Sequence, residues 1–175
     1  MQKLILLALL AFLCACTPSQ EDESLRKKIA QMIIIGFRGV DKIDYHDFYF
    51  LLAKYGVGGF ILFDRDLALQ TQVRNLENKK QIKGLIEKIQ GIRSADPYFF
   101  IAIDQEGGLV ARLNPENGFN SMPTAAEMGR TSATETYAAV SPITKEMANL
   151  GINLNIAPVV DIDSTANNGI HELQR

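Results

Sequence analysis

The residues best suited to chemistry lie in a short run, DQEGG, at positions 104–108. It contains two carboxylates, Asp104 and Glu106, followed by a glycine pair that can form a tight turn. An apolar run at residues 98–103 precedes it and predicts a strand buried on both faces. In parallel α/β folds, ligands bind beyond the carboxyl ends of such strands. The alternative is a solvated turn with no function.

The elements that must position these residues alternate along the chain. Short apolar runs predict buried strands at residues 31–37, 57–63, 98–103 and 152–160. Apolar residues at helical spacing predict helices at residues 44–55, 71–94 and 132–150. This alternation predicts a parallel sheet with right-handed crossovers.

Two of the predicted helices carry internal signals. In the helix at 71–94, one apolar face is expected from Ile82, Leu85, Ile86, Ile89 and Ile92. The helix at 132–150 contains Pro142, which removes a backbone donor. Either this helix kinks, or Ser141 caps a second helix with Pro142 at its first position.

Two architectures fit the alternation, an open doubly wound sheet and part of a (β/α)8 barrel. No GxGxxG run follows the first predicted strand, and no phosphate-loop motif occurs in the sequence. Nucleotide binding is therefore disfavoured. The residue pattern by itself leaves both architectures open.

Several runs resemble, in order, the signature of glycoside hydrolase family 3, nearest to its β-N-acetylhexosaminidase branch. DQEGG is followed by Val110, Arg112 and a loop ending in Met122 and Pro123. The other matching runs are GVGGFILF at 56–63, EMA at 146–148, LGIN at 150–153 and NIAPVVD at 155–161. The resemblance covers residues 29–175 and implies a (β/α)8 TIM barrel.

The four predicted strands would then be the first four of an incomplete barrel. A full barrel takes about 250 residues, and residues 29–175 are too few for one. We therefore expect this chain to be a fragment or truncated product, with the N-terminal half of the barrel domain at residues 29–175.

The resemblance also implies which residues contact the sugar. Asp104 matches an aspartate that accepts hydrogen bonds from sugar hydroxyls, a task that suits a carboxylate. Arg112 matches an arginine that contacts the same sugar, and its rigid fork would orient Asp104. Arg175 matches a third arginine of the family, although its surroundings are only loosely alike. The alternative for Arg112 is an ordinary surface arginine.

The family's catalytic groups are not among these residues. The resemblance implies an aspartate nucleophile on a later strand and a histidine proton donor in a Lys-His-Phe-Pro-Gly-His-Gly loop. His46 and His171 lie outside any such motif and are expected at the surface. Without the resemblance, Asp104 and Glu106 would be the tempting catalytic pair. We assign no catalytic residue and predict that residues 1–175 alone are inactive.

The implied function is removal of terminal β-linked N-acetylglucosamine, or another N-acetylhexosamine, from glycans with retention. A β-glucosidase of the same family is the nearest alternative. An alternative from another class is a non-catalytic sugar-binding lipoprotein or an inactive remnant.

Other carboxylates carry weaker signals. Asp64, Arg65 and Asp66 follow the second predicted strand and could line a pocket, but a solvated position is favoured. Asp161 and Asp163 could suggest a metal, but two aspartates alone are a weak signal. We expect no metal and no cofactor.

The amino terminus predicts export. A basic start, an aliphatic run at residues 4–13 and small residues before Cys16 are typical of a secretory signal. The run is too short for a transmembrane helix, and the polar residues after it disfavour a core helix. The residues LCAC resemble a bacterial lipoprotein box, which implies a signal peptide at 1–16, lipidation of Cys16 and a polar tether at 17–28.

This predicts a membrane-anchored lipoprotein of the bacterial cell envelope, on its periplasmic or extracellular side. The two cysteines, Cys14 and Cys16, both lie in this leader, so the body has no disulfide framework. A net charge of −2 gives no indication of nucleic acid as a partner. The expected partners are a carbohydrate and a membrane, and the full-length protein is expected to be a monomer.

Overall fold

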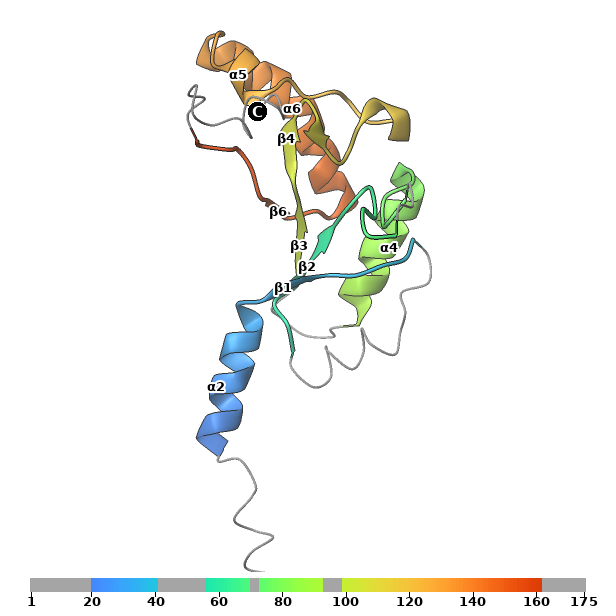
Figure 1. The fold of residues 1–175 in the computed structure, drawn as a ribbon, viewed down its shortest axis with the longest axis vertical. Helices are drawn as coiled ribbons and strands as arrows, with labels where there is room; N and C mark the ends of the chain where they lie inside the picture. Colours follow the sequence, from blue (N-terminus) through green and yellow to red (C-terminus); the bar gives the residue numbers. More distant parts are fainter. Residues whose placement is uncertain (1–19, 41–55, 70–72, 93–98, 162–175) are drawn as a thin grey trace, which may run out of the picture.

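The computed structural model of the chain describes residues 20–40, 56–69, 73–92 and 99–161. Its main sheet has four strands in the order β1-β2-β3-β6 (Figure 1). Their bounds are Ile34–Gly36 for β1, Gly59–Leu62 for β2, Phe100–Ile103 for β3 and Leu154–Asn155 for β6. All three pairings are parallel, which confirms the predicted sheet type.

The strand order decides between the two architectures. In a doubly wound sheet the order reverses after the first strands, whereas a barrel keeps neighbours in chain order. Here each strand pairs with the next parallel strand along the chain. The sheet is therefore part of a (β/α)8 barrel, as the resemblance implied.

The outer strands are shorter than predicted. The first begins at Ile34 rather than Gln31, because Gln31 is the last residue of helix α2, Gln20–Gln31. It is only partly buried, contrary to the prediction. The fourth has no regular structure beyond Asn155, and Pro158 within that run has no N–H to donate to a ladder.

At the start of strand β3, one face is buried and the other is exposed. Phe99, Ile101 and Ile103 are at most 1% exposed, whereas Phe100 is 51% exposed. Successive side chains of a strand point to opposite faces. The prediction that this strand is buried on both faces is therefore wrong at Phe100, which lies on the face away from the helices.

The segment predicted as a tether is helical from Gln20 onward. Helix α2 projects away from the sheet (Figure 1), and Ala30 is its one buried residue. Its first turn is acidic, with Glu21, Asp22 and Glu23.

Helix α4, Lys79–Gly91, is shorter than the predicted helix at 71–94. It begins after Asn78, whose side chain accepts a hydrogen bond from the backbone N–H of Gln81. The residues before the helix form hydrogen bonds outside it. The N–H groups of Arg74 and Asn75 donate to backbone carbonyl oxygens of the loop that follows β2, at 2.9 and 3.0 Å. These contacts hold the chain out of helical geometry.

Helix α6, Ala133–Leu150, runs without interruption through Pro142. The alternative in which Ser141 caps a second helix is therefore wrong. Ser132 and Glu135 form a capping box at the start, and Gly151 ends the helix in the left-handed conformation.

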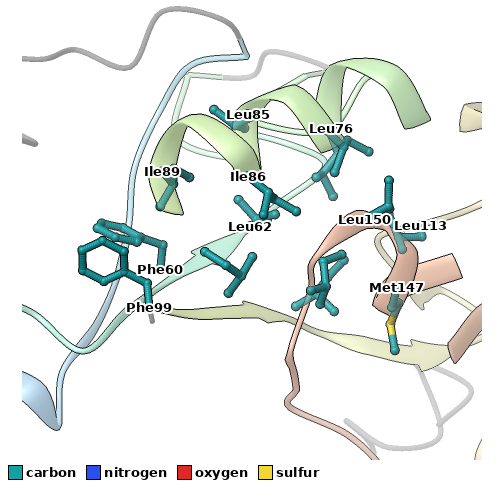
Figure 2. Packing of buried hydrophobic residues seen from close by; sticks show 14 of the residues in the cluster. Phe60, Leu62, Leu76, Leu85, Ile86, Ile89, Phe99, Leu113, Met147 and Leu150 are labelled. Carbon is teal, nitrogen blue, oxygen red and sulfur yellow. The ribbon is translucent and has the colours of Figure 1, made fainter. Parts of the chain in front are cut away.

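One hydrophobic core joins these elements (Figure 2). Helices α4 and α6 pack on the same face of the sheet, and Ile82, Leu85, Ile86 and Ile89 of α4 are buried as predicted. The rings of Phe60 and Phe99 meet edge to face at 5.1 Å. Smaller elements complete the described chain: β4 Gln105–Gly107, β5 Val110–Ala111, the 3-10 helix η1 Pro115–Asn117 and helix α5 Ala125–Met128.

In the described ranges, no helix has the length and apolar character needed to cross a membrane. The predicted leader at 1–16 and the predicted helix at 44–55 lie outside those ranges.

Candidate functional site

The candidate site lies at the carboxyl ends of β2 and β3. The two strands pair in register through Leu62 and Ile103. Asp104 directly follows β3, and Asp64 follows β2 by two residues. The two aspartates therefore emerge side by side from neighbouring strands, at the edge where ligands bind in barrels.

A short hairpin brings Arg112 back to Asp104. Strand β4 pairs antiparallel with β5, so the chain turns at Gly108 and Leu109. Gly107 has φ +98°, and a Cβ there would lie 2.0 Å from the carbonyl oxygen of Pro123. Only glycine fits this approach of strand to loop.

The hairpin is fixed by Gln105, which is fully buried. Its side-chain amide donates to the carbonyl oxygen of Leu113 and accepts from the Leu113 N–H, both at 2.9 Å. Leu113 is itself part of the core (Figure 2). Because Gln105 follows Asp104 and Leu113 follows Arg112, this bond pair holds the two site residues together.

Arg112 bridges two carboxylates. Its Nη2 donates to Asp104 Oδ2 at 3.4 Å, and its Nη1 donates to Asp64 Oδ1 at 3.3 Å. The guanidinium also lies 5.9 Å from the centre of the Phe63 ring. Arg112 thus lies beside Asp104, with 25% of its side chain exposed.

Asp64 is buried, which overturns the expectation that it is solvated. It is 8% exposed, and Arg65 Nε donates to its Oδ2 at 3.2 Å while Arg112 holds its Oδ1. The sequence could not reveal this, because the arginine that covers Asp64 lies 48 positions away.

Asp66 is also buried, at 2% exposure, but it faces different groups. It pairs with Arg38 and accepts hydrogen bonds from the N–H groups of Ala68 and Leu69, both at 3.1 Å. The hydrogen bond from Arg38 holds the pKa of Asp66 below its usual value. Asp66 therefore stabilises the loop after β2, and its predicted solvation is likewise wrong.

Glu106 is 8% exposed and lies within β4. Arg112 forms ion pairs with Asp64 and with Asp104. The contact with Asp104 suits a role in holding a ligand, and we assign no catalytic role to Asp104 and Glu106.

A hollow of about 380 Å³ opens beside Arg112, with Asp64, Arg74 and Leu109 among its lining residues. Pockets for small ligands have volumes of about 300–1,000 Å³. Its lining combines charged and apolar side chains, as expected for a surface that orients a polar ligand by a few groups.

Two side-chain amides, those of Asn75 and Asn155, support the site and were missed by the sequence reasoning. Asn75 is fully buried, accepts from the N–H of Phe63 at 3.1 Å and donates to carbonyl oxygens of Phe37 and Gly39. It ties together the ends of β1 and β2. No local pattern marks Asn75, since it lay inside a predicted helix.

Asn155 extends the pairing of β3 and β6 by one step. Its side chain accepts from the N–H of Gln105 at 3.0 Å and donates to the carbonyl oxygen of Gln105 at 3.1 Å. Asn153 makes the same kind of bonds to Ile101 and Phe99. Asn153 and Asn155 lie two residues apart in the predicted strand at 152–160, and this spacing was the sequence signal that could have identified them.

The remaining predicted residues are not placed. Arg175, Cys16, His46, His171 and Asp163 lie outside the described residues. Asp161 is exposed. Among residues that the structure describes, no group of three or more His, Cys, Asp or Glu side chains could hold a metal ion.

Known proteins similar to this chain share a family. Beta-hexosaminidase A of Pseudoalteromonas piscicida is 37% identical over 69% of this chain and 20% of its own length. Beta-hexosaminidase of Neisseria meningitidis serogroup C is 35% identical over 61% of this chain and 28% of its own length. The chain thus spans less than a third of these curated relatives.

Solved structures agree with the fold. A fungal multi-domain GH3 beta-N-acetylglucosaminidase superposes with a TM-score of 0.66 at 30% identity, covering 79% of this chain and 15% of that one. Beta-N-acetylhexosaminidase from Beutenbergia cavernae gives 0.60 at 24% identity, covering 83% and 41%. The second likeness is evidence of fold only.

The sequence model described as "Glycosyl hydrolase family 3 N terminal domain" matches residues 24–173, which is most of the chain. Together with the parallel strands in chain order and the relatives above, this match shows that the chain belongs to glycoside hydrolase family 3.

Proposed function

We propose that Asp104 and Arg112 bind one sugar of a glycan in an enzyme that removes terminal β-linked N-acetylglucosamine or another N-acetylhexosamine. The observation that carries the proposal is the 3.4 Å contact between Arg112 Nη2 and Asp104 Oδ2 at the carboxyl end of β3. It joins two polar groups at the edge of the sheet where barrel enzymes bind their ligands.

The chemistry of Asp104 suits this task. Its side chain is 21% exposed, and its Oδ1 has no hydrogen-bond partner among the described residues. A carboxylate oxygen in that state can accept from two neighbouring hydroxyls of a saccharide, by charge-assisted hydrogen bonds. Arg112 beside it supplies donors in a rigid plane, which suits ring or acetamido oxygens.

The choice of an N-acetylated sugar rests on the printed names of the relatives, which are beta-hexosaminidases. The nucleophile and proton donor that the family resemblance implies are not among residues 1–175. The role proposed for these residues is therefore to bind and orient the sugar, and the cleavage itself requires groups on other residues.

Release of nitrophenol from the β-N-acetylglucosaminide and the β-glucoside tests the proposal. It should be measured with residues 1–175 and with the product of the whole reading frame that encodes them. We expect no turnover by residues 1–175, and preference for the N-acetylglucosaminide by any longer product. Turnover by residues 1–175 would mean that catalytic groups lie among them, and a preference for the glucoside would favour a β-glucosidase.

We propose in addition that Cys16 is lipidated and anchors the protein to a membrane of the cell envelope. The support is the LCAC run after an aliphatic stretch, and several acyl chains suffice for stable anchoring. Metabolic labelling with a fatty acid should mark the wild type and the Cys14→Ser variant, but not Cys16→Ser. Equal labelling of both variants would refute the assignment.

A further inference from the structure

We infer that Asp64 is a positioning residue for the sugar site: its carboxylate fixes the guanidinium of Arg112 in the orientation that meets Asp104 and the ligand. The role of Arg112 rests on the function proposed above. Asp64 itself stands outside the DQEGG motif, on the loop that follows the neighbouring strand β2.

Hydrogen bonds from both Nη atoms orient the guanidinium of Arg112. Nη1 donates to Asp64 Oδ1 at 3.3 Å, and Nη2 donates to Asp104 Oδ2 at 3.4 Å. Its Nε is buried and has no hydrogen-bond partner within the described ranges. A planar guanidinium held at both Nη atoms cannot rotate about its long axis, whereas one held at a single atom can.

Asp64 is the more firmly held of the two carboxylates. Its side chain is 11% exposed against 21% for Asp104. Its second oxygen accepts from Arg65 Nε at 3.2 Å, so both of its oxygens are engaged. Asp104 retains an oxygen for the ligand. Asp64 is therefore the fixed anchor, and Asp104 is the carboxylate that faces the sugar.

The bond to Asp64 keeps Arg112 in position while a sugar binds. When sugar hydroxyls compete for Asp104, Arg112 keeps its bond to Asp64 and stays in place. Without Asp64, the arginine would lose the partner that holds its Nη1, and a ligand would compete for the remaining bond to Asp104. Binding to a preoriented arginine has a smaller entropic cost, since less side-chain freedom is lost on binding.

Two variants test the inference: Asp64→Ala removes the anchor, and Asp64→Asn keeps the shape and an acceptor oxygen but removes the charge. Asp66→Ala is the matched control, because Asp66 is also a buried aspartate on the same loop, and it pairs with Arg38. All are measured well below their thermal unfolding midpoints, with circular dichroism to verify folding.

The first readout is NMR of the Arg112 guanidinium, which needs no ligand. Hindered rotation should separate the two Nη resonances in the wild type and in Asp66→Ala, and Asp64→Ala should average them. The second readout is affinity for N-acetylglucosamine. We expect about a tenfold loss for Asp64→Ala, a smaller loss for Asp64→Asn, and less than about a twofold change for Asp66→Ala.

Separate Nη resonances at the wild-type spacing in folded Asp64→Ala would overturn the inference. So would an equal loss of affinity in Asp66→Ala, because the effect would then reflect general loosening of the loop. A wild-type chain that binds no sugar refutes the proposed function instead, while the guanidinium resonances still decide whether Asp64 orients Arg112.

Discussion

The side-chain amide of Gln105 forms two hydrogen bonds with the backbone of Leu113, each 2.9 Å long. The two residues adjoin Asp104 and Arg112, so one buried amide sets the spacing of the candidate sugar site. Leu113 in turn is fully buried in the hydrophobic core. The site therefore depends on the core through residues that do not themselves face a ligand.

Replacing Gln105 by alanine should weaken both the fold and the site. The N–H and carbonyl groups of Leu113 would be left buried without their partner, which costs about 1–3 kcal/mol in the free energy of unfolding. Urea unfolding measures this loss, and N-acetylglucosamine affinity should fall with it.

The matched control is Gln90→Ala. Gln90 makes the same pair of amide bonds to Phe99, at 3.0 and 3.1 Å, far from Arg112. It should reduce stability but leave the sugar affinity unchanged. If both variants lose affinity equally, Gln105 acts only through overall stability.

A Gly107→Ala substitution should be severely destabilising. Gly107 has φ +98°, and a Cβ would lie 2.0 Å from the Pro123 carbonyl oxygen, so backbone must move. We expect a loss of at least about 3 kcal/mol in the free energy of unfolding.

Gly118→Ala separates the two causes. Gly118 also has a positive φ, +82°, but nothing lies within 4 Å of its Cβ position. It should cost only about 1 kcal/mol, from backbone strain. Similar losses in the two variants would show that the close approach to Pro123 is not tight in solution.

Sequence patterns located the buried faces better than the ends of elements. The apolar spacing identified Ile82, Leu85, Ile86 and Ile89 as one face of a helix, because that spacing is a local property. The start of α4 depends on Asn75, whose bonds to Phe63 and Gly39 join residues distant in sequence. The local spacing of apolar residues does not predict such long-range hydrogen bonds.

In the site, too, local features could be predicted from the sequence and long-range contacts could not. Asp104 and Arg112 could be recognised because they lie within one motif and are eight residues apart. Asp64 looked solvated, since its sequence neighbours are charged and its partner Arg112 comes from a later hairpin. Burial of a carboxylate by a distant arginine is a tertiary effect that composition does not encode.

Stability should depend on pH through Asp66. The hydrogen bond from Arg38 lowers the pKa of Asp66, with burial acting in the opposite direction. A carboxyl group whose pKa is lower in the folded state stabilises the fold above its unfolded pKa, about 4 for aspartate. That contribution is lost as the pH falls through the folded pKa.

Asp66→Asn should therefore unfold more easily than the wild type near neutral pH, and the difference should shrink as the pH falls below about 4. Urea unfolding of both proteins across this range measures it. A difference that stays constant with pH would show that the charge of Asp66 does not contribute.

The most direct test of the sugar site is an NMR titration of the chain with N-acetylglucosamine. It should follow the carboxyl carbon of Asp104 and the guanidinium nitrogens of Arg112, in the wild type and in Asp104→Asn. We predict saturable shifts at both groups, and an affinity at least about tenfold lower in the variant, as expected for loss of charge-assisted hydrogen bonds. Saturable binding with neither group shifted, or equal affinity in Asp104→Asn, would contradict the account.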